Sequence, residues 1–322
     1  MVERQKALLA LIVTVLFWGL SFISIKIAVV VFPPMSLGAL RFSLALVLLY
    51  GIKRKMAPQE TMKLRDLPYL VGAGLIGVTA YFFCENNGVS LVSASEASII
   101  IAAIPVITMI SDQIDQSVEY RRMIRRGPGA QNPWAEPPRR PTIAKRRLFG
   151  AILSVAGVWL VAGGTLQVSG NLRGYVFMGG AALSWVVYSF LTRPLFSRHS
   201  RIFIVFWQTV FGFLGFLPFA FFEIPRWGQP TLVVLLHVAY LGIFCSALGY
   251  WFYAMAMGSL GVSTSTVFIN LIPVVTVVSA FFALQDRLRP IQWLGAVAVL
   301  SGVYAATLER GFHHSKEKAR PS

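Results

Sequence analysis

The feature that most constrains this chain is a series of long apolar segments, and the clearest of them lie between Leu235 and Leu308. That stretch holds two and a half hydrophobic segments joined by short links. Each full segment approaches the roughly 20 residues that an α-helix needs to cross the hydrocarbon core of a bilayer. Backbone groups inside a bilayer have no water to bind, so these segments must be helical.

Ten segments of this kind predict an all-α integral membrane protein with ten transmembrane helices. Their approximate bounds are 7–31, 34–52, 67–91, 94–111, 147–164, 172–193, 202–223, 231–256, 262–284 and 289–308. The composition agrees, because 13% of the residues are charged, against about 25% in soluble domains. The first apolar run continues to Val31 without a small-residue cleavage site, so we expect a membrane helix there rather than a signal peptide.

The basic residues predict the orientation of the helices. A formal net charge of +16 would suggest nucleic acid as a partner for a soluble protein, but in membrane proteins basic residues gather in cytoplasmic loops. With the N-terminus in the cytoplasm, 23 of the 29 Lys and Arg residues fall in cytoplasmic segments and 4 on the other side. We therefore expect a multi-pass protein in the lipid bilayer of a bacterial-type cytoplasmic (inner) membrane. Both termini, including the polar tail 309–322, are expected in the cytoplasm, and no nucleic acid partner is expected.

The two halves of the chain resemble each other. Trp18 aligns with Trp185 at an offset of 167, and Pro105 with Pro273 at an offset of 168. Around these prolines, SASEASIIIAAIPVIT matches GVSTSTVFINLIPVVT, and later GAILSVAGVW matches GAVAVLSGVY. Each half holds five predicted helices, and five is an odd number, so the second half is predicted to be inverted relative to the first.

We therefore predict two repeats, at 1–164 and 172–308. Inverted repeats suit alternating access, in which a central site opens through two similar gates on opposite sides of the membrane. The alternative is a duplication that only stabilises a helix bundle. Pro105 and Pro273 are expected to kink helices four and nine near the centre.

Three charged residues are predicted to lie inside the membrane, where charges are costly and usually face a cavity or a partner. Lys26, Arg41 and Glu85 all fall roughly 8–10 Å below the outer surface, given a rise of about 1.5 Å per residue. Equal depth makes a Lys26–Glu85 or an Arg41–Glu85 pair plausible. We hypothesise that Glu85 is a proton-sensitive or ammonium-binding group, with Asn86 and Asn87 as polar ligands. The alternative is a fixed ion pair that locks the outer gate.

Aromatic side chains form a second group of candidates. Trp18 and Trp185 occupy equivalent repeat positions, so both are expected to line a cavity. Tyr188, Tyr250 and Tyr253 can bind an apolar or cationic substrate through their ring faces, although packing alone would also explain each of them. Asn270, just before Pro273, can bond a freed backbone carbonyl or a substrate.

Cofactors and enzymatic chemistry are not expected. Four histidines and two cysteines are scattered without the spacing of a metal site. No nucleophile–base set is visible, and no Walker motif is present for direct use of ATP. We therefore expect neither a metal nor an enzyme, and protons are a candidate coupling ion.

Three stretches of the chain resemble the EamA-type transporters of the drug/metabolite transporter superfamily. They are FWGLSFISIK, YFFCENNGVSLVSASEASIIIAAIPV, and the run from GYWFYAMAMG to GAVAVLSGV. The resemblance implies a ten-helix inner-membrane carrier whose central cavity is lined mainly by helices one to four and six to nine. It also implies a secondary transporter that exports small metabolites, such as amino acids, or drugs. The alternative is a non-transporting membrane scaffold or sensor, or an inactive carrier relic.

The first repeat departs from this family at its fourth helix. Between the matched proline and glycine it carries 23 more residues than the second repeat, and 112–146 is rich in Arg and Pro. We predict that helix four is short and that 112–146 is an atypical, disordered cytoplasmic loop. It would be either a regulatory or lipid-binding loop or a tolerated scramble of the coding sequence. The family's Gly-Glu pair is missing there, and its second copy reads Gln285-Asp286.

Overall fold

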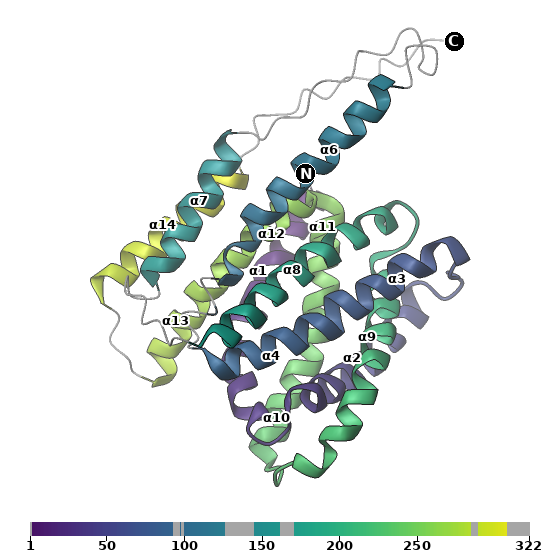
Figure 1. Cartoon of the computed structure of the whole chain (residues 1–322), viewed down its shortest axis with the longest axis vertical. Coiled ribbons are helices and arrows are strands. Elements are labelled where there is room, and N and C mark those ends of the chain that lie inside the picture. The colour runs from purple at the N-terminus through teal and green to yellow at the C-terminus, as the bar shows by residue number, and fades with distance from the viewer. Residues whose placement is uncertain are drawn as a thin grey trace.

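The computed structural model describes residues 2–92, 97, 100–125, 145–161, 171–284 and 289–307, and the regular structure in these residues is helical throughout. The α-helices are α1 (Val2–Val29), α2 (Pro34–Met56), α3 (Leu67–Gly74), α4 (Tyr81–Leu91), α6 (Ile104–Arg125), α7 (Lys145–Val161), α8 (Leu172–Thr192), α9 (Arg201–Glu223), α10 (Leu232–Tyr240), α11 (Gly249–Leu260), α12 (Val262–Val267), α13 (Ile272–Leu284) and α14 (Pro290–Thr307). Shorter 3₁₀ or π segments lie between several of them: η1 (Leu64–Asp66), η2 (Leu75–Ala80), η4 (Arg193–Ser197), η5 (Ile224–Arg226), η6 (Leu241–Leu248) and η7 (Phe268–Leu271). Figure 1 shows the helices gathered in one bundle.

Six helices in the described residues are long and apolar enough to cross a membrane. They span Glu3–Val29, Pro34–Met56, Leu64–Leu91, Leu172–Ser197, Arg201–Arg226 and Leu232–Leu260. Three further apolar helices are shorter, at Leu148–Val161, Val262–Thr276 and Pro290–Ala306. Large apolar side chains such as Val47, Val176 and Phe222 are exposed on the bundle, as expected of a surface that faces lipid. The predicted class, an all-α membrane protein, is confirmed, and the count of ten membrane crossings stays a prediction.

Helix packing follows the predicted repeats. In the two-repeat arrangement, the helices of the first half have counterparts in the second half. The helix α1 corresponds to α8, α2 to α9, α4 to α11, α6 to α12–α13, and α7 to α14. The helix α1 packs against α11 and α13, and its equivalent α8 packs against α4 and α6. The helices α2 and α9 pack against each other, as do α7 and α14. When the two halves are exchanged, the pair α1–α11 becomes α8–α4 and the pair α1–α13 becomes α8–α6. The pairs α2–α9 and α7–α14 stay the same, which is consistent with two repeats.

The helices α7 and α14 lie side by side at one flank of the bundle (Figure 1), and their backbones approach each other closely at glycine residues. A Cβ atom on Gly150 would lie 2.5 Å from the carbonyl oxygen of Gly302, and one on Gly157 would lie 2.8 Å from that of Gly295. Glycines therefore let the two backbones approach, as small residues do in membrane helix pairs. Residue numbers rise along α7 from Gly150 to Gly157 while those of their partners in α14 fall from Gly302 to Gly295. The two helices are therefore antiparallel, as inverted repeats require.

Pro105 and Pro273 were both expected to kink a helix, and the structure puts each at the start of one. The backbone turns at Ala102 and Ala103 before α6 begins at Ile104, and the 3₁₀ segment η7 precedes α13. A proline fits the first turn of a helix because its missing N–H has no partner there anyway. Both fourth helices are thus broken and restarted at equivalent positions.

The predicted loop 112–146 needs correction at its start. The helix α6 continues to Arg125 and extends beyond its neighbours at the top of Figure 1. The reason is that 111–125 contains neither proline nor glycine, and the prolines that forbid a helix begin only at Pro128. Asp112, expected in the loop, instead binds Arg193 at 2.8 Å and Ser263 at 3.0 Å. The remainder, 126–144, and the tail 309–322 lie outside the described residues.

Candidate functional site

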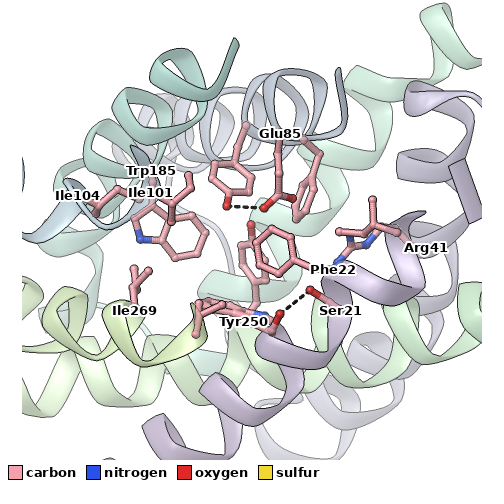
Figure 2. A pocket seen from close by; sticks show the side chains of 14 residues that line it. Ser21, Phe22, Arg41, Glu85, Ile101, Ile104, Trp185, Tyr250 and Ile269 are labelled. Atoms are coloured by element: carbon pink, nitrogen blue, oxygen red, sulfur yellow. Dashed lines mark hydrogen bonds between the residues drawn. The ribbon is translucent and has the colours of Figure 1, made fainter. Parts of the chain in front are cut away.

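A central pocket lies where the two halves of the bundle meet (Figure 2). The helices α1, α2, α4 and α6 line it from the first half, and α8, α11, η7 and α13 from the second. The space left for water is about 40 Å³, enough for roughly three molecules. The side chains therefore leave little free space in the pocket in this conformation.

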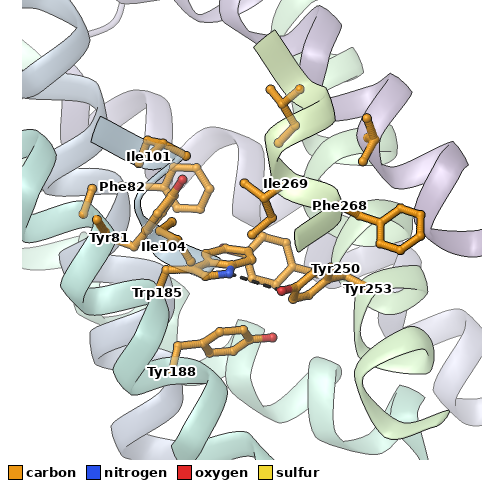
Figure 3. Packing of buried hydrophobic residues seen from close by; sticks show 14 of the residues in the cluster. Tyr81, Phe82, Ile101, Ile104, Trp185, Tyr188, Tyr250, Tyr253, Phe268 and Ile269 are labelled. Carbon is orange, nitrogen blue, oxygen red and sulfur yellow. Dashed lines mark hydrogen bonds between the residues drawn. The ribbon is translucent and has the colours of Figure 1, made fainter. Parts of the chain in front are cut away.

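Aromatic rings form one wall of this pocket (Figure 3). The rings of Trp18 and Trp185 meet edge to face, with their centroids 5.2 Å apart and their planes at 88°. Tyr250 lies 5.8 Å from each of them. Tyr253 and Tyr188 are fully buried behind this wall and do not line the pocket themselves. Trp185 Nε1 donates a hydrogen bond of 3.4 Å to the hydroxyl of Tyr253. The sequence thus identified the aromatic cluster, and the structure divides it into a pocket surface and a supporting layer.

Four isoleucines from the two broken helices form an apolar wall. Ile101 and Ile104 line the pocket from the first half, and Ile269 and Ile272 line it from the second. Each pair is related by the offset of 168 that aligns the two prolines. Sequence reasoning did not select these residues, although their symmetric position just before each proline was a usable signal.

Arg41 is a buried cation that lines the pocket, with 2% of its surface exposed. Its Nε donates to the Ser246 hydroxyl at 2.8 Å, and its guanidinium lies 4.3 Å from the centroid of the Phe82 ring. Its Nη1 is buried without a hydrogen-bond partner. Ser246 belongs to the π segment η6, and the chain approaches Arg41 there through Gly242, whose Cβ would lie 2.8 Å from the Arg41 carbonyl oxygen.

Glu85 lines the same pocket and is 6% exposed. The Tyr81 hydroxyl donates to its Oε1 at 2.9 Å, the bond drawn beside Glu85 in Figure 2. The structure brings Arg41 and Glu85 into one pocket without a direct ion pair between them, since the ion pairs of the described residues join other side chains.

Lys26 does not join this pocket. The pocket-lining residues of α1 are Trp18, Ser21, Phe22 and Ile25, which share one helix face. Lys26 is exposed, because each residue turns the helix by about 100° and Lys26 follows Ile25 directly. The suggested pairing of Lys26 with Glu85 is corrected by the phase of the helix, and the depth of Lys26 in the membrane stays a prediction.

The three candidate asparagines also lie outside the pocket. Asn86 donates to the Pro34 carbonyl at 3.0 Å, and Asn87 donates to the Phe83 carbonyl of its own helix at 2.7 Å. Asn270 is fully buried and donates to the Ser154 hydroxyl at 2.6 Å. These amides join backbone turns and neighbouring helices, so the structure corrects their expected place beside the substrate.

The third helix of each repeat contains a π segment, which sequence reasoning missed. The segments are η2 (Leu75–Ala80) and η6 (Leu241–Leu248). Trp18 Nε1 donates to the Cys245 carbonyl of η6 at 3.0 Å, and the Tyr250 hydroxyl donates to the Gly77 carbonyl of η2 at 3.1 Å. The irregular backbone thus provides carbonyl acceptors for two side chains that line the pocket. Such π segments occur frequently at functional sites.

The charge in the pocket comes from one half only. The offset of 167 relates Arg41 to Gln208, and the offset of 168 relates Glu85 to Tyr253. Gln208 is buried and donates to the Thr192 hydroxyl at 2.9 Å. Symmetric helices therefore enclose an asymmetric pocket, with both charges on the side of the first repeat.

Polar contacts join the two halves at one end of α2. Glu223, at the end of α9, accepts the backbone N–H groups of Met35 at 3.0 Å and Ser36 at 2.7 Å. Trp227 donates to the Ser36 hydroxyl at 2.8 Å. A carboxylate at a helix N-terminus is favourable because it satisfies free N–H groups and the helix dipole.

A second set of contacts joins the halves beyond the other end of α2. His199 places Nδ1 2.9 Å from Glu60 and Nε2 3.0 Å from Asp66. Arg198 donates to Asp66 at 2.6 Å. Lys63, Arg65 and Asp66 are charged and precede α3, so this cluster lies at the end of the helix and not in its apolar part. Burial alone raises the pKa of Asp66, but hydrogen bonds and charge from His199 and Arg198 outweigh it, so the pKa lies below the ordinary 3.8.

A metal centre finds no support in the part of the chain that the structure describes, where no group of three or more His, Cys, Asp or Glu side chains could hold an ion. What the pocket offers is one cation, one carboxylate, aromatic faces and aliphatic side chains. This arrangement can bind a small amphipathic molecule.

Comparison with known proteins gives a uniform result. The model of the EamA-like transporter family matches residues 5–114 and 172–308. An uncharacterized transporter of Archaeoglobus fulgidus is 29% identical, over 95% of this chain and 99% of that protein. A probable terminal-alkyne amino-acid exporter of Streptantibioticus cattleyicolor is 26% identical, over 94% and 93% of the two chains. A probable amino-acid metabolite efflux pump of Escherichia coli is 24% identical, over 94% of both. One crystal structure, 17% identical, superposes with a TM-score of 0.70 over 94% of this chain and 98% of the other, which shows a shared fold.

Proposed function

The chain belongs to the EamA-like transporter family, and from that premise we propose that it exports amino acids or related small metabolites across the cytoplasmic membrane as a secondary carrier. The observation that carries the proposal is the narrow pocket between the two halves, which holds a buried carboxylate, a buried guanidinium and an aromatic wall. The relatives named as amino-acid exporters or efflux pumps support this class of substrate.

Alternating access is the proposed mechanism. Both halves contain a helix that breaks and restarts beside the pocket, before Pro105 and before Pro273. Short breaks of this kind can absorb backbone rotation while the flanking helices stay rigid. The contacts of Glu223 with α2 and the cluster around His199 join the two halves at opposite ends of α2. We propose that each set loosens in turn while the other holds, so that the pocket opens to one side at a time.

Glu85 is the proposed centre of coupling. A carboxylate that is almost fully buried is costly when charged and alone, so it gains from a proton or from a cationic group of the substrate. Competition between the two would link export to proton entry. In this proposal both chain termini lie in the cytoplasm, in line with the distribution of basic residues.

Growth protection in a bacterial host lacking its own exporters tests the proposal. The host expresses wild type, Glu85→Gln or Lys26→Gln and is challenged with amino acids, toxic amino-acid analogues and cationic drugs. We expect protection against amino-acid analogues, lost in Glu85→Gln and kept in Lys26→Gln, since Lys26 is exposed outside the pocket. Equal amounts of each variant in the membrane are verified by immunoblotting.

Two results would contradict the proposal. Absence of protection against every compound, with folded wild type in the membrane, argues against export. Protection by Glu85→Gln with unchanged strength and pH dependence argues against the role of Glu85 while leaving export intact.

A further inference from the structure

The guanidinium of Arg41 indicates a preference for one chemical class of substrate, which membership of the family alone does not specify. Building on the proposed function, we infer that Arg41 binds the carboxylate of the substrate while Glu85 binds its ammonium group. The pocket then selects zwitterionic amino acids with apolar side chains over amines and cationic drugs of the same shape.

The first argument is the missing partner of Arg41. The side chain is 2% exposed, and its Nη1 has no hydrogen-bond partner. Its Nε donates to a neutral hydroxyl, that of Ser246. The ion pairs within the described residues do not include Arg41. Glu85 lines the same pocket but forms no direct ion pair with Arg41. A buried cation without a directly bonded anion is costly, so an anionic group that binds Arg41 recovers much of that cost.

The second argument is the geometry of the guanidinium. Its planar fork binds a carboxylate through two parallel hydrogen bonds, which a flexible ammonium group does not match. The Phe82 ring, 4.3 Å from the guanidinium carbon, stacks against Arg41, and Ser246 fixes its Nε. These contacts hold the guanidinium in place, so little side-chain entropy is lost when a ligand binds.

The third argument is the division of the pocket. The first repeat contributes both charges together with apolar residues such as Phe22 and Ile101, whereas the second repeat contributes only uncharged residues, namely Trp185, Tyr250, Ile269 and Ile272. A free α-amino acid has the same division, with two charged groups on one carbon and a side chain pointing away. A monovalent cationic drug would satisfy Glu85 and leave Arg41 buried and unpaired, which is unfavourable.

A matched set of ligands tests the inference. L-Leucine, 3-methylbutylamine and 4-methylpentanoic acid share one aliphatic chain, but the amine lacks the carboxylate and the acid lacks the ammonium group. Alanine and phenylalanine are tested in the same way against ethylamine and 2-phenylethylamine. Binding to the purified full chain is measured by the rise in its thermal unfolding temperature with ligand concentration, which does not require transport.

For wild type we expect each amino acid to bind roughly 10- to 100-fold more tightly than its amine, the ratio for one or two charge-assisted hydrogen bonds. Arg41→Gln should abolish this ratio, and Arg41→Lys should reduce it. Glu85→Gln should instead abolish the preference for leucine over 4-methylpentanoic acid. Lys26→Gln, which removes a cation outside the pocket, should keep both ratios.

The inference is overturned if wild type binds the amines as tightly as the amino acids, or if Arg41→Gln keeps the wild-type ratio. The wild-type comparison stands even where a variant fails to fold. The binding result is also separate from export. If the protein exports amino acids but binds them no better than the amines, only this inference is rejected. If binding depends on the carboxylate but no export is found, only the proposed function is rejected.

Discussion

The glycine contact between α7 and α14 gives a prediction whose size follows from the structure. In Gly157→Ala, the new Cβ would lie 2.6 Å from the backbone nitrogen of Val299 and 2.8 Å from the carbonyl oxygen of Gly295. Ordinary contact begins near 3.4 Å, so the helices must separate by about 0.8 Å. These two atoms belong to the backbone and cannot rotate aside; the third near atom, Cγ2 of Val299 at 2.8 Å, belongs to a side chain.

We expect Gly157→Ala to lower the free energy of unfolding by about 1–2 kcal/mol. Overpacking of this kind costs about 1–3 kcal/mol, and the better helix propensity of alanine returns about 0.5–1 kcal/mol. Gly179→Ala in α8 is the matched control, because a Cβ there meets nothing within 4 Å. The control should gain about 0.5–1 kcal/mol from propensity alone, so the two substitutions should have opposite signs.

The assay is the unfolding midpoint of the purified protein in detergent micelles, followed by far-UV circular dichroism. The double variant Gly157→Ala/Gly295→Ala adds a second test. Its loss should be smaller than the sum of the single losses, because one separation of the helices relieves both contacts. A Gly157→Ala protein as stable as its Gly179→Ala counterpart would refute the close packing of α7 on α14.

Two further predictions concern the contacts that join the halves. Glu223→Gln should lower the free energy of unfolding by about 1–2 kcal/mol, because an uncharged amide is a weaker cap for α2; an unchanged unfolding midpoint in the same micelle assay would contradict the cap. Asp66→Asn should lower the unfolding temperature by several degrees at neutral pH, because it removes the charged partner of His199 and Arg198. Since the folded-state pKa of Asp66 is lowered, its stabilisation is complete above the ordinary pKa of 3.8 and is lost as pH falls through the folded-state value. The difference in unfolding temperature between wild type and Asp66→Asn should thus stay constant near neutral pH and shrink in strong acid; a difference that grows on acidification would contradict this linkage.

The position of the charges within the pocket shows where sequence reasoning succeeded and where it stopped. Lys26, Arg41 and Glu85 were predicted at one depth from their distance along each helix. Arg41 and Glu85 do share a pocket, but Lys26 is exposed. Depth follows from counting residues, whereas the direction of a side chain depends on how neighbouring helices rotate the element.

The loop after helix four shows a different limit. The whole of 112–146 is rich in Arg and Pro, and on that composition the sequence predicts that helix four ends near Ser111. The structure continues α6 to Arg125, because helix-breaking residues start only at Gly127 and Pro128. The polar composition predicts that this part leaves the apolar span, but polarity does not by itself end a helix.

The sequence alone determined the membrane class, predicted two repeats with an irregularity at Pro105 and Pro273, and identified most of the aromatic cluster. All of these follow from apolar length, from internal similarity and from proline, which act locally along the chain. Only the tertiary structure decided that Arg41 lines the pocket with an unpartnered Nη1, that Asn86 and Asn270 bond to neighbouring helices, and that four isoleucines line one pocket. These features depend on contacts between residues far apart in the chain. No local pattern specifies the rotation and spacing of helices that packing imposes on both halves together.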